Sequence, residues 1–334
     1  MDSTVPLMDN NVRSGSGRIR RILAHAWTVL LTAATAIWLY GQVVRDSSTW
    51  EAIAFYLPSP LLAVSLIASA GIGCWLRHRR RATLYAMLAV LPAVFVGGVE
   101  NHWQSDAANI ESVPRDQRLR IVHWNVAHGG SRWQRQTQRV RNLDADVVVI
   151  TEPPAVVRPE DFPGYSLSRL PHMLVAIRGT QRQSGALVPG GALHAFLIEC
   201  ETDVGQLRLM VADMTSRILV PRDPYLRMMM TASTERQADV IVGDLNAPRR
   251  SLALTDENFP FRHAYSVVGV GWGYTWPVPA PVLAIDQCLI GQRVEPLAYR
   301  LVSTLESDHR LQCFDFRLKE FVDRGDNSVD ASSE

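Results

Sequence analysis

Five short polar motifs stand at the boundaries of apolar, strand-like runs, and their side chains could bind a hard metal ion and orient a water molecule. The motifs are Trp124-Asn125, Thr151-Glu152, Gly243-Asp244-Leu245-Asn246, Ala284-Ile285-Asp286 and Ser307-Asp308-His309. Carboxylate and amide oxygens suit Mg²⁺ or Mn²⁺. An Asp beside an Asn can orient a water molecule and hold a phosphoryl oxygen, and a His beside an Asp can stabilise charge on a transferring phosphoryl group. Together the motifs favour hydrolysis of a phosphate ester or pyrophosphate.

Short buried strands must position these motifs. Residues 119–124 and 146–150 are apolar runs of strand length, and the polar segment 132–143 between them suits a helix, which predicts a β-α-β unit. Further strands are expected at residues 173–177, 195–199, 207–212, 240–242, 283–290 and 312–318. Ligand sites in α/β folds collect outside the carboxyl ends of strands, so the five motifs are expected to meet in one pocket.

Over residues 118–318 the five motifs, in this order, resemble those of the endonuclease/exonuclease/phosphatase superfamily. The most specific are Gly243-Asp244-Leu245-Asn246-Ala247-Pro248 and Ser307-Asp308-His309. The resemblance implies an α/β fold of two mixed β-sheets packed face to face with outer helices, a DNase I-like sandwich. With membrane spans ahead of the domain, the chain looks most like the bacterial branch that includes the VanJ-type teicoplanin-resistance proteins, which implies a lipid phosphate or pyrophosphate substrate.

The resemblance also implies roles for the catalytic residues. Asp244 matches the Asp that positions and deprotonates the attacking water, and Asn246 matches the Asn that contacts phosphoryl oxygens. His309 matches the terminal His, and Asp286 the Asp paired with it. Alone, Asp244 and Asn246 would equally suit a β-turn with a helix cap, His309 a surface histidine, and Asp286 a buried hydrogen-bonding anchor.

The metal ligands are carried over in the same way. Glu152 matches the metal-binding Glu, Asn125 the Asn that arranges metal and phosphate, and Asp308 an adjacent Asp that binds the metal or supports its ligands. Glu152 could instead merely end a strand, because Pro153 and Pro154 follow it. The resemblance predicts Mg²⁺ or Mn²⁺ as the cofactor.

Two positions depart from the family pattern. A middle strand usually ends in His, but here Asp213 occupies that position. Its carboxylate could act as an acid or a metal ligand if neighbours tune its pKa, or it could mark reduced activity. Gln287 replaces the aromatic residue or His that often follows the Asp at position 286, and we expect that change to be tolerated.

Several other polar residues have open roles. We expect His123 to pack within a strand and leave His128 open. Arg227 could contact phosphate or lie on a helix surface. Thr275-Trp276-Pro277 is expected to be structural or to line the rim of the site. The four cysteines lack metal-site spacing and are expected to be buried thiols, although one disulfide among Cys200, Cys288 and Cys313 stays open.

The N-terminal third is apolar. Spans at residues 22–44, 52–76 and 83–99 predict about three transmembrane helices, with a buried helical hairpin of a soluble protein as the alternative. Arginines at positions 18, 20 and 21 and at 77 and 79–81 flank the first two spans on one side, which the positive-inside rule places in the cytoplasm. Everything after about Glu100 is then expected outside the membrane, so the protein is predicted to be a multi-pass cell-membrane protein with an extracytoplasmic catalytic domain.

These patterns divide the chain into five parts. We expect a disordered cytoplasmic tail at 1–21, a membrane region at 22–99, a tether at 100–117, a catalytic domain at 118–320 and a disordered tail at 321–334. The net charge is only +1, so a nucleic-acid partner is not indicated. An extracytoplasmic nuclease and a non-catalytic binding module remain the rival functions, and the sequence gives no oligomeric state.

Overall fold

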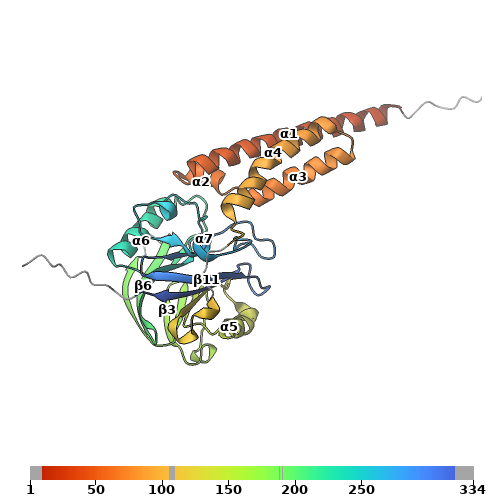
Figure 1. The fold of residues 1–334 in the computed structure, drawn as a ribbon. Helices are drawn as coiled ribbons and strands as arrows, with labels where there is room; N and C mark the ends of the chain where they lie inside the picture. The colour runs from red at the N-terminus through yellow and green to blue at the C-terminus, as the bar shows by residue number, and fades with distance from the viewer. Residues whose placement is uncertain (1–9, 105–109, 188, 190, 320–334) are drawn as a thin grey trace, which may run out of the picture. The chain divides into compact units, whose positions relative to one another are not determined.

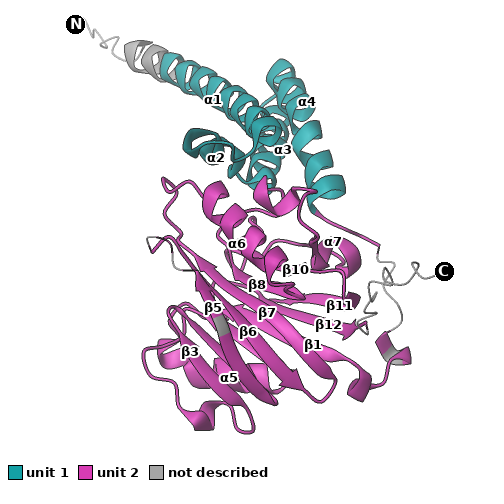
Figure 2. Cartoon of the chain, turned by 90° about the vertical axis from the view of Figure 1, so that its left-hand side faces the viewer, with its two compact units in different colours: residues 1–100 teal, residues 101–334 magenta. Residues whose placement is uncertain are grey.

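The chain divides between Glu100 and Asn101 into two units (Figure 2). A computed structural model describes residues 10–104, 110–187, 189 and 191–319. The predicted tail at 321–334, residues 1–9 of the predicted N-terminal tail and residues 105–109 of the predicted tether lie outside the described residues.

The described residues of the N-terminal unit form helices joined by short turns. It comprises α1 (Asn10–Val44), α2 (Thr49–Phe55), α3 (Ser59–Trp75), α4 (Arg79–Phe95) and a π-helical turn (Val96–Glu100). By length and composition, two segments could cross a membrane, Arg18–Val44 and Arg79–Glu100. Because α1 begins at Asn10, residues 10–21 are helical rather than disordered as we expected.

The predicted second span at 52–76 is not one helix. It is broken into α2 and α3, which differ in direction by 49°. Pro58 precedes α3 and Pro60 lies in its first turn. Proline has no backbone N–H and its ring clashes with the preceding turn, so a helix cannot continue through this segment. The unit therefore has two candidate spans, or three if the bent pair crosses as one.

The C-terminal unit contains two six-stranded sheets (Figure 1). The first has the strand order β11-β12-β1-β2-β4-β3, and the second β5-β6-β7-β8-β10-β9. Their bounds are β1 Leu119–Asn125, β2 Val147–Thr151, β3 Ser166–Leu170, β4 Met173–Ile177, β5 Thr180–Leu187, β6 Leu193–Thr202, β7 Gly205–Met214, β8 Val240–Asp244, β9 Arg262–His263, β10 Asp286–Ile290, β11 Val294–Val302 and β12 Leu311–Leu318.

Both sheets are mixed. Strands β1 and β2 run parallel, as do β7 and β8, and every other neighbouring pair is antiparallel. A parallel pair needs a crossover connection, usually a helix. Helix α5 (Trp133–Arg141) lies in the β1–β2 connection and α6 (Asp223–Glu235) in the β7–β8 connection. The short helix α7 (Ala264–Val268) follows β9.

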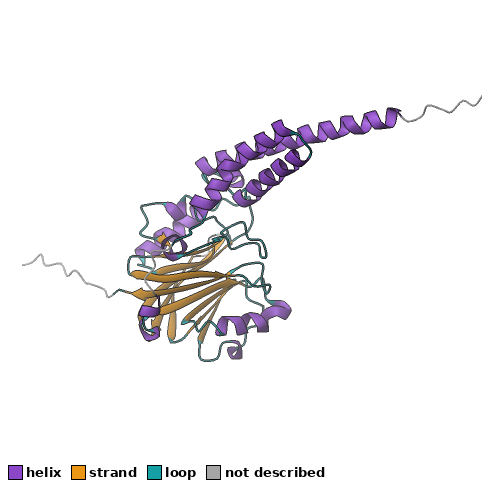
Figure 3. Cartoon of the chain, turned by 45° about the vertical axis from the view of Figure 1, so that its right-hand side comes forward, coloured by secondary structure: helices purple, strands orange, loops and turns teal. Residues whose placement is uncertain are grey.

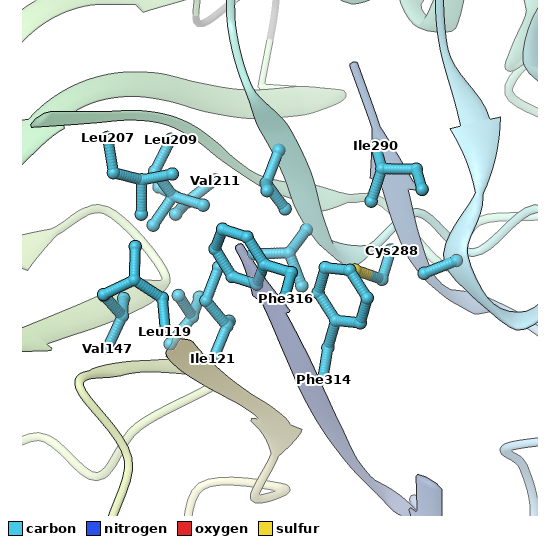
Figure 4. Close-up of a cluster of buried hydrophobic side chains, with 14 of the residues drawn as sticks. Leu119, Ile121, Val147, Leu207, Leu209, Val211, Cys288, Ile290, Phe314 and Phe316 are labelled. Atoms are coloured by element: carbon cyan, nitrogen blue, oxygen red, sulfur yellow. The ribbon is translucent and has the colours of Figure 1, made fainter. Parts of the chain in front are cut away.

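Alternate residues of the central strands form the core between the two sheets. Figure 4 shows Leu119 and Ile121 of β1 facing Leu207, Leu209 and Val211 of β7, with Phe316 of β12 beside them and Phe314 next to Cys288. The intervening residues of the central strands face outward into two further buried clusters that include residues of α5 and α6, and Figure 3 shows helices flanking the strands. Both faces of the central strands are therefore buried, and the predicted face-to-face sandwich with outer helices is confirmed.

The strands that sequence reasoning missed are all edge strands. β3 and β11 border the first sheet, and β5 and β9 border the second. Edge strands are exposed on one side and carry polar residues, so they lack the apolar runs that mark central strands. The missed strands do not contribute the motif residues.

Candidate functional site

The strand topology brings the five motifs to one end of the sandwich. Asn125 ends β1 and Glu152 follows β2, while Asp244 ends β8. The remaining two motifs precede β10 and β12 rather than follow strands, contrary to the sequence expectation. Those strands run antiparallel to β8 and β1, so their starts lie at the same end. In the ladder Asp244 pairs with Asp286 on one side and Asp213 on the other.

An aspartate–histidine pair lies at the centre of the site. His309 Nδ1 is 2.9 Å from Asp286 Oδ2, and both side chains are buried. Burial alone would lower the pKa of His309, but the adjacent Asp286 carboxylate raises it to about 10. Burial would likewise raise the pKa of Asp286, but His309 holds it below its ordinary value. The pair is therefore an imidazolium–carboxylate pair at neutral pH.

Asp244 is the buried carboxylate beside this pair. Its Oδ2 accepts a hydrogen bond from Asn125 Nδ2 at 2.9 Å and lies 3.9 Å from His309 Nε2. Its Oδ1 accepts from the Asn246 backbone N–H at 3.0 Å. Burial, followed by the charge of Asp286, raises the pKa of Asp244 to about 7. A carboxylate with a pKa near 7 can accept a proton from water at neutral pH.

The backbone around Asp244 requires unusual conformations. A Cβ at Gly243 would lie 1.7 Å from the Ala212 carbonyl oxygen, so only glycine lets β8 approach β7 this closely. Asn246 has φ of +46° and Glu152 has φ of +49°, both in the left-handed region that non-glycine residues rarely adopt. Strained residues of this kind cluster at functional sites. Asn246 also donates through Nδ2 to the Met214 carbonyl at 2.8 Å, which fixes its amide beside Asp244.

Hydrogen bonds that the sequence did not predict hold the backbone of Asp286 and His309 in place. Thr275 Oγ1 accepts from the Asp286 backbone N–H at 3.2 Å, and Ser307 Oγ donates to the Asn125 carbonyl at 2.7 Å and accepts from the His309 N–H. His123, expected to pack within its strand, is fully buried with Nδ1 4.0 Å from Asp286 Oδ1. Burial lowers the pKa of His123 to about 4, so it is neutral and does not compete for the Asp286 charge.

Asp213 faces the other carboxylates of the site. It is 8% exposed, and burial together with the charges of Asp244, Glu152 and Asp286 raises its pKa to about 8. Like charges this close disfavour ionisation. Asp213 is therefore within electrostatic reach of the proposed catalytic and metal-binding residues, which the sequence left open.

Two histidines missed in the sequence lie against Asp213. His172 Nδ1 is 3.8 Å from Asp213 Oδ2, and its ring stacks on His194 with centroids 4.5 Å apart. The His172 carbonyl also accepts from the Glu152 N–H at 2.9 Å. An imidazole thus stands beside the position where the family pattern has a His on the strand itself. His172 lies in the β3–β4 turn, so only the fold brings it there.

The donor set fits a divalent cation. Ligand atoms of Asp244, Asp286 and His309 lie within 4.8 Å of one another. The buried Asp286 Oδ1 has no hydrogen-bond partner, and a cation near it would satisfy this oxygen. The crowded carboxylates of Asp213, Asp244 and Glu152 would also be stabilised by a positive charge. The set contains no thiolate, which suits a hard cation.

The remaining predicted residues differ in how close they lie to the centre. Asp308 is exposed and accepts from Trp276 Nε1 at 3.1 Å, so it belongs to the rim. Asn125 lies at the centre, where its Nδ2 donates to Asp244. Its amide oxygen accepts from the Ala127 N–H, which leaves one lone pair of that oxygen for another partner. His128 is exposed, 3.5 Å from Glu152. Arg227 is paired with Asp223 and Asp256, which favours a structural role over phosphate contact.

Gln287 and the cysteines complete the set of residues that the sequence singled out. Gln287 Nε2 donates to the carbonyls of Ala247 and Ala284, so it supports the loop that carries the Asp244 motif. All four cysteines are free thiols, and no disulfide joins Cys200, Cys288 and Cys313. These three are buried as expected, whereas Cys74 is exposed.

Comparison with known proteins finds solved structures that resemble this chain but no matching sequence. No protein-family model and no curated protein matches the chain. An endonuclease/exonuclease/phosphatase from Beutenbergia cavernae is 16% identical with a TM-score of 0.47, covering 61% of this chain and 72% of its own. An endonuclease/exonuclease/phosphatase family protein from Bacteroides thetaiotaomicron is 11% identical with a TM-score of 0.49, covering 61% and 98%. A mannosyl-6-phosphatase of the same organism is 12% identical with a TM-score of 0.47, covering 59% and 99%.

The first two neighbours carry the name of the family whose motifs the sequence resembles. At such low identity and overlap they do not determine the chemistry of this chain, and the VanJ-type branch is not among the structures named here. The chemistry follows from the geometry of the site itself.

Proposed function

We propose that this chain is a membrane-anchored, divalent-cation-dependent phosphoesterase. The observation that carries the proposal is the buried Asp286–His309 pair, 2.9 Å apart, with the Asp244 carboxylate 3.9 Å from the other ring nitrogen. An acceptor for a water proton and a cationic donor for a phosphoryl oxygen thus lie side by side. This combination suits water attack on phosphorus.

Each residue has a role in this mechanism. Asp244 accepts the proton of the attacking water. His309 donates a hydrogen bond through Nε2 to a phosphoryl oxygen, while Asp286 keeps the ring protonated and oriented. Asn246, fixed by Met214, supports the same phosphoryl group. One such donor typically contributes about 10²- to 10³-fold in rate.

Glu152 and Asp213 would hold the cation, which supplies positive charge to a phosphoryl oxygen when it is bound. The pKa of Asp213, which is raised first by burial and then by the charges of Asp244 and Glu152, supports this assignment, because a cation would stabilise the ionised Asp213 carboxylate. Asp244, Asp286 and His309 are the competing ligand set, since their ligand atoms also lie close together. The hydrogen bond to Asp286 keeps His309 protonated, and a protonated imidazole has no lone pair for a metal. Glu152 and Asp213 are therefore the favoured ligands.

We further propose a lipid phosphate or lipid pyrophosphate as the substrate, with Mg²⁺ or Mn²⁺ as the cation. Two or three apolar helices precede the catalytic unit, and a membrane anchor would keep the site near lipid headgroups. The VanJ-type resemblance of the sequence points the same way, and the arginine clusters predict that the unit lies outside the cytoplasm.

The test is hydrolysis by the purified full chain in detergent. A lipid pyrophosphate, a lipid monophosphate and single-stranded DNA are compared with Mg²⁺, with Mn²⁺ and after chelation, with phosphate release or strand cleavage as the readout. Asp244→Asn should lower the rate at least about 10²-fold. Asp116→Asn is the matched control, because Asp116 is exposed and outside the site.

Cleavage of DNA alone would assign the protein as a nuclease. The second candidate function is a non-catalytic binding module, favoured by Asp213 in the position of a family His. It would be established if the wild type binds the cation and a lipid phosphate but hydrolyses none of the three substrates.

A further inference from the structure

A cavity of about 570 Å³ in the N-terminal unit is lined by arginines. Six contribute, Arg20 and Arg21 from α1, Arg77 from the α3–α4 connection, and Arg79, Arg80 and Arg81 from the first turn of α4. His78 and Ala24 complete the lining, and no acidic residue is among the described residues that form it. The cavity therefore brings six arginine side chains together.

The first turn of α4 increases this charge. A helix N-terminus carries a partial positive charge and is stabilised by acidic residues, but this turn has three arginines and no acid. The residue that precedes it, His78, makes no side-chain capping hydrogen bond. An anion in the cavity would counter the arginines and accept from the first-turn N–H groups together.

We propose that this cavity binds a phosphate-bearing anion, and specifically the headgroup of an acidic phospholipid. Arginine is suited to phosphate because its planar fork can donate two parallel hydrogen bonds to phosphate oxygens. Basic pockets between membrane helices bind anionic headgroups for this reason. A volume of about 570 Å³ lies within the range of small-molecule sites.

The position of the cavity on the helices indicates that the bound anion is a lipid headgroup rather than a free phosphate. Both segments able to cross a membrane, Arg18–Val44 and Arg79–Glu100, begin at the arginines of the cavity. The α1 surface beyond it exposes large apolar side chains, including Trp27 and Leu30. A lipid could place its phosphate among the arginines and its acyl chains along this surface. This step rests on the proposed membrane insertion but does not require the proposed hydrolysis.

The opposite end of α1 provides a contrast. Arg45 there is followed by Asp46, and Glu51 lies in the next helix, so positive and negative charges alternate. Arg20 and Arg45 are separated by about 38 Å along a helix at 1.5 Å per residue. A headgroup site is thus assigned to one end of the unit only.

The experiment measures lipid binding by the purified full chain in a neutral detergent. Phosphatidylglycerol and phosphatidylcholine with identical acyl chains are titrated separately, and bound lipid is counted by native mass spectrometry. The test variant is Arg77→Gln/Arg80→Gln. The matched control, Arg45→Gln/Arg135→Gln, removes the same two charges outside the cavity.

Wild type and control should bind phosphatidylglycerol in preference to phosphatidylcholine. The cavity variant should bind phosphatidylglycerol about 30-fold more weakly, because each of the two arginines contributes about fivefold. Equal binding of both lipids by the wild type, or equal affinity in the cavity variant and the control, would overturn the proposal. If the variant does not fold, salt gives the same test in the wild type. Binding that is unchanged between 0.1 M and 1 M salt would contradict a site held by charge.

Inorganic phosphate and pyrophosphate distinguish the two sources of the anion. A lipid site should retain phosphatidylglycerol at millimolar concentrations of either anion. Displacement of the lipid by free phosphate at those concentrations would overturn the lipid assignment and give the cavity to a soluble phosphate. Because binding is counted directly, a protein that hydrolyses nothing can still confirm or refute this site.

Discussion

Replacing Asp286 by Asn tests the central pair without a substrate. In the wild type, the pKa of His309 is about 10, against 6.5 for an ordinary histidine. The unfolded chain therefore releases this proton near pH 6.5, and the folded chain holds it until about pH 10. Between these values the folded state binds more protons, so its stability is full below pH 6.5 and falls as the pH rises.

The size of the effect follows from the same two values. Integrated between pH 6.5 and 8.5, the difference lowers the free energy of unfolding by about 2 kcal/mol. For a unit of this size that corresponds to about 4–8 °C in melting temperature. Asp286→Asn removes the carboxylate that raises the pKa of His309. The decrease in stability between pH 6.5 and 8.5 should therefore disappear in the variant. At pH 6.5 the variant should be less stable than the wild type.

The assay is thermal unfolding of the full chain in detergent, followed by tryptophan fluorescence at half-unit steps from pH 6.5 to 8.5 with chelator present. The difference between wild type and variant removes the contribution of groups distant from Asp286. It still contains changes at Asp244 and Asp213, because burial and, in addition, the charge of Asp286 raise their pKa values to about 7 and about 8. Asp116→Asn is the control and should keep the wild-type slope. A wild-type melting temperature that is flat over this range, or a variant with the same slope, would refute the assignment of the pair as imidazolium and carboxylate.

Three further predictions concern the site and the membrane region. Gly243→Ala should destabilise the fold by at least about 3 kcal/mol, measured by denaturant unfolding, because the new Cβ would collide with the Ala212 carbonyl. An alanine at Gly130, where φ is +58° but a Cβ meets no atom within 4 Å, is the comparison and should cost only about 1–2 kcal/mol, the cost of the left-handed backbone. His309→Ala should abolish turnover but leave the affinity for Mn²⁺, measured by calorimetry, within about threefold of wild type. Asp213→Ala should weaken the Mn²⁺ affinity at least about tenfold. A larger loss of Mn²⁺ affinity in His309→Ala than in Asp213→Ala would make His309 the ligand. A reporter enzyme fused after residue 320 should be active only outside the cytoplasm, and cytoplasmic activity would reverse the proposed topology.

The sequence predicted the central part of the fold and the motif residues because both depend on local patterns. The apolar strands β1, β2, β4, β7 and β8 were identified from buried runs, and the polar residues at their ends gave the site. The edge strands were missed because one side of each is exposed to water. The break at Pro58 was missed because tolerance of proline depends on packing against neighbouring helices rather than on composition.

The contacts around Asp213 depend on long-range packing. His172 and Asp213 are on different sheets, and no spacing in the sequence relates them. Thr275 and Ser307 belong to motifs that the sequence singled out, but their hydrogen bonds to Asp286 and Asn125 follow only from the placed strands. The sequence therefore predicted the candidate site residues but not the hydrogen bonds between them.

The hydrogen bonds at the centre of the site also join the two halves of the sandwich. Asn125, from the first sheet, bonds Asp244 in the second, and His309, which precedes a strand of the first sheet, bonds Asp286 in the second. Neither sheet alone contains a complete site. A small slide of one sheet over the other would separate the reacting groups before it disrupted the apolar core, so activity should be lost earlier than tertiary structure during gradual denaturation. Loss of the proposed activity would therefore report a change in the alignment of the two sheets before the protein unfolds.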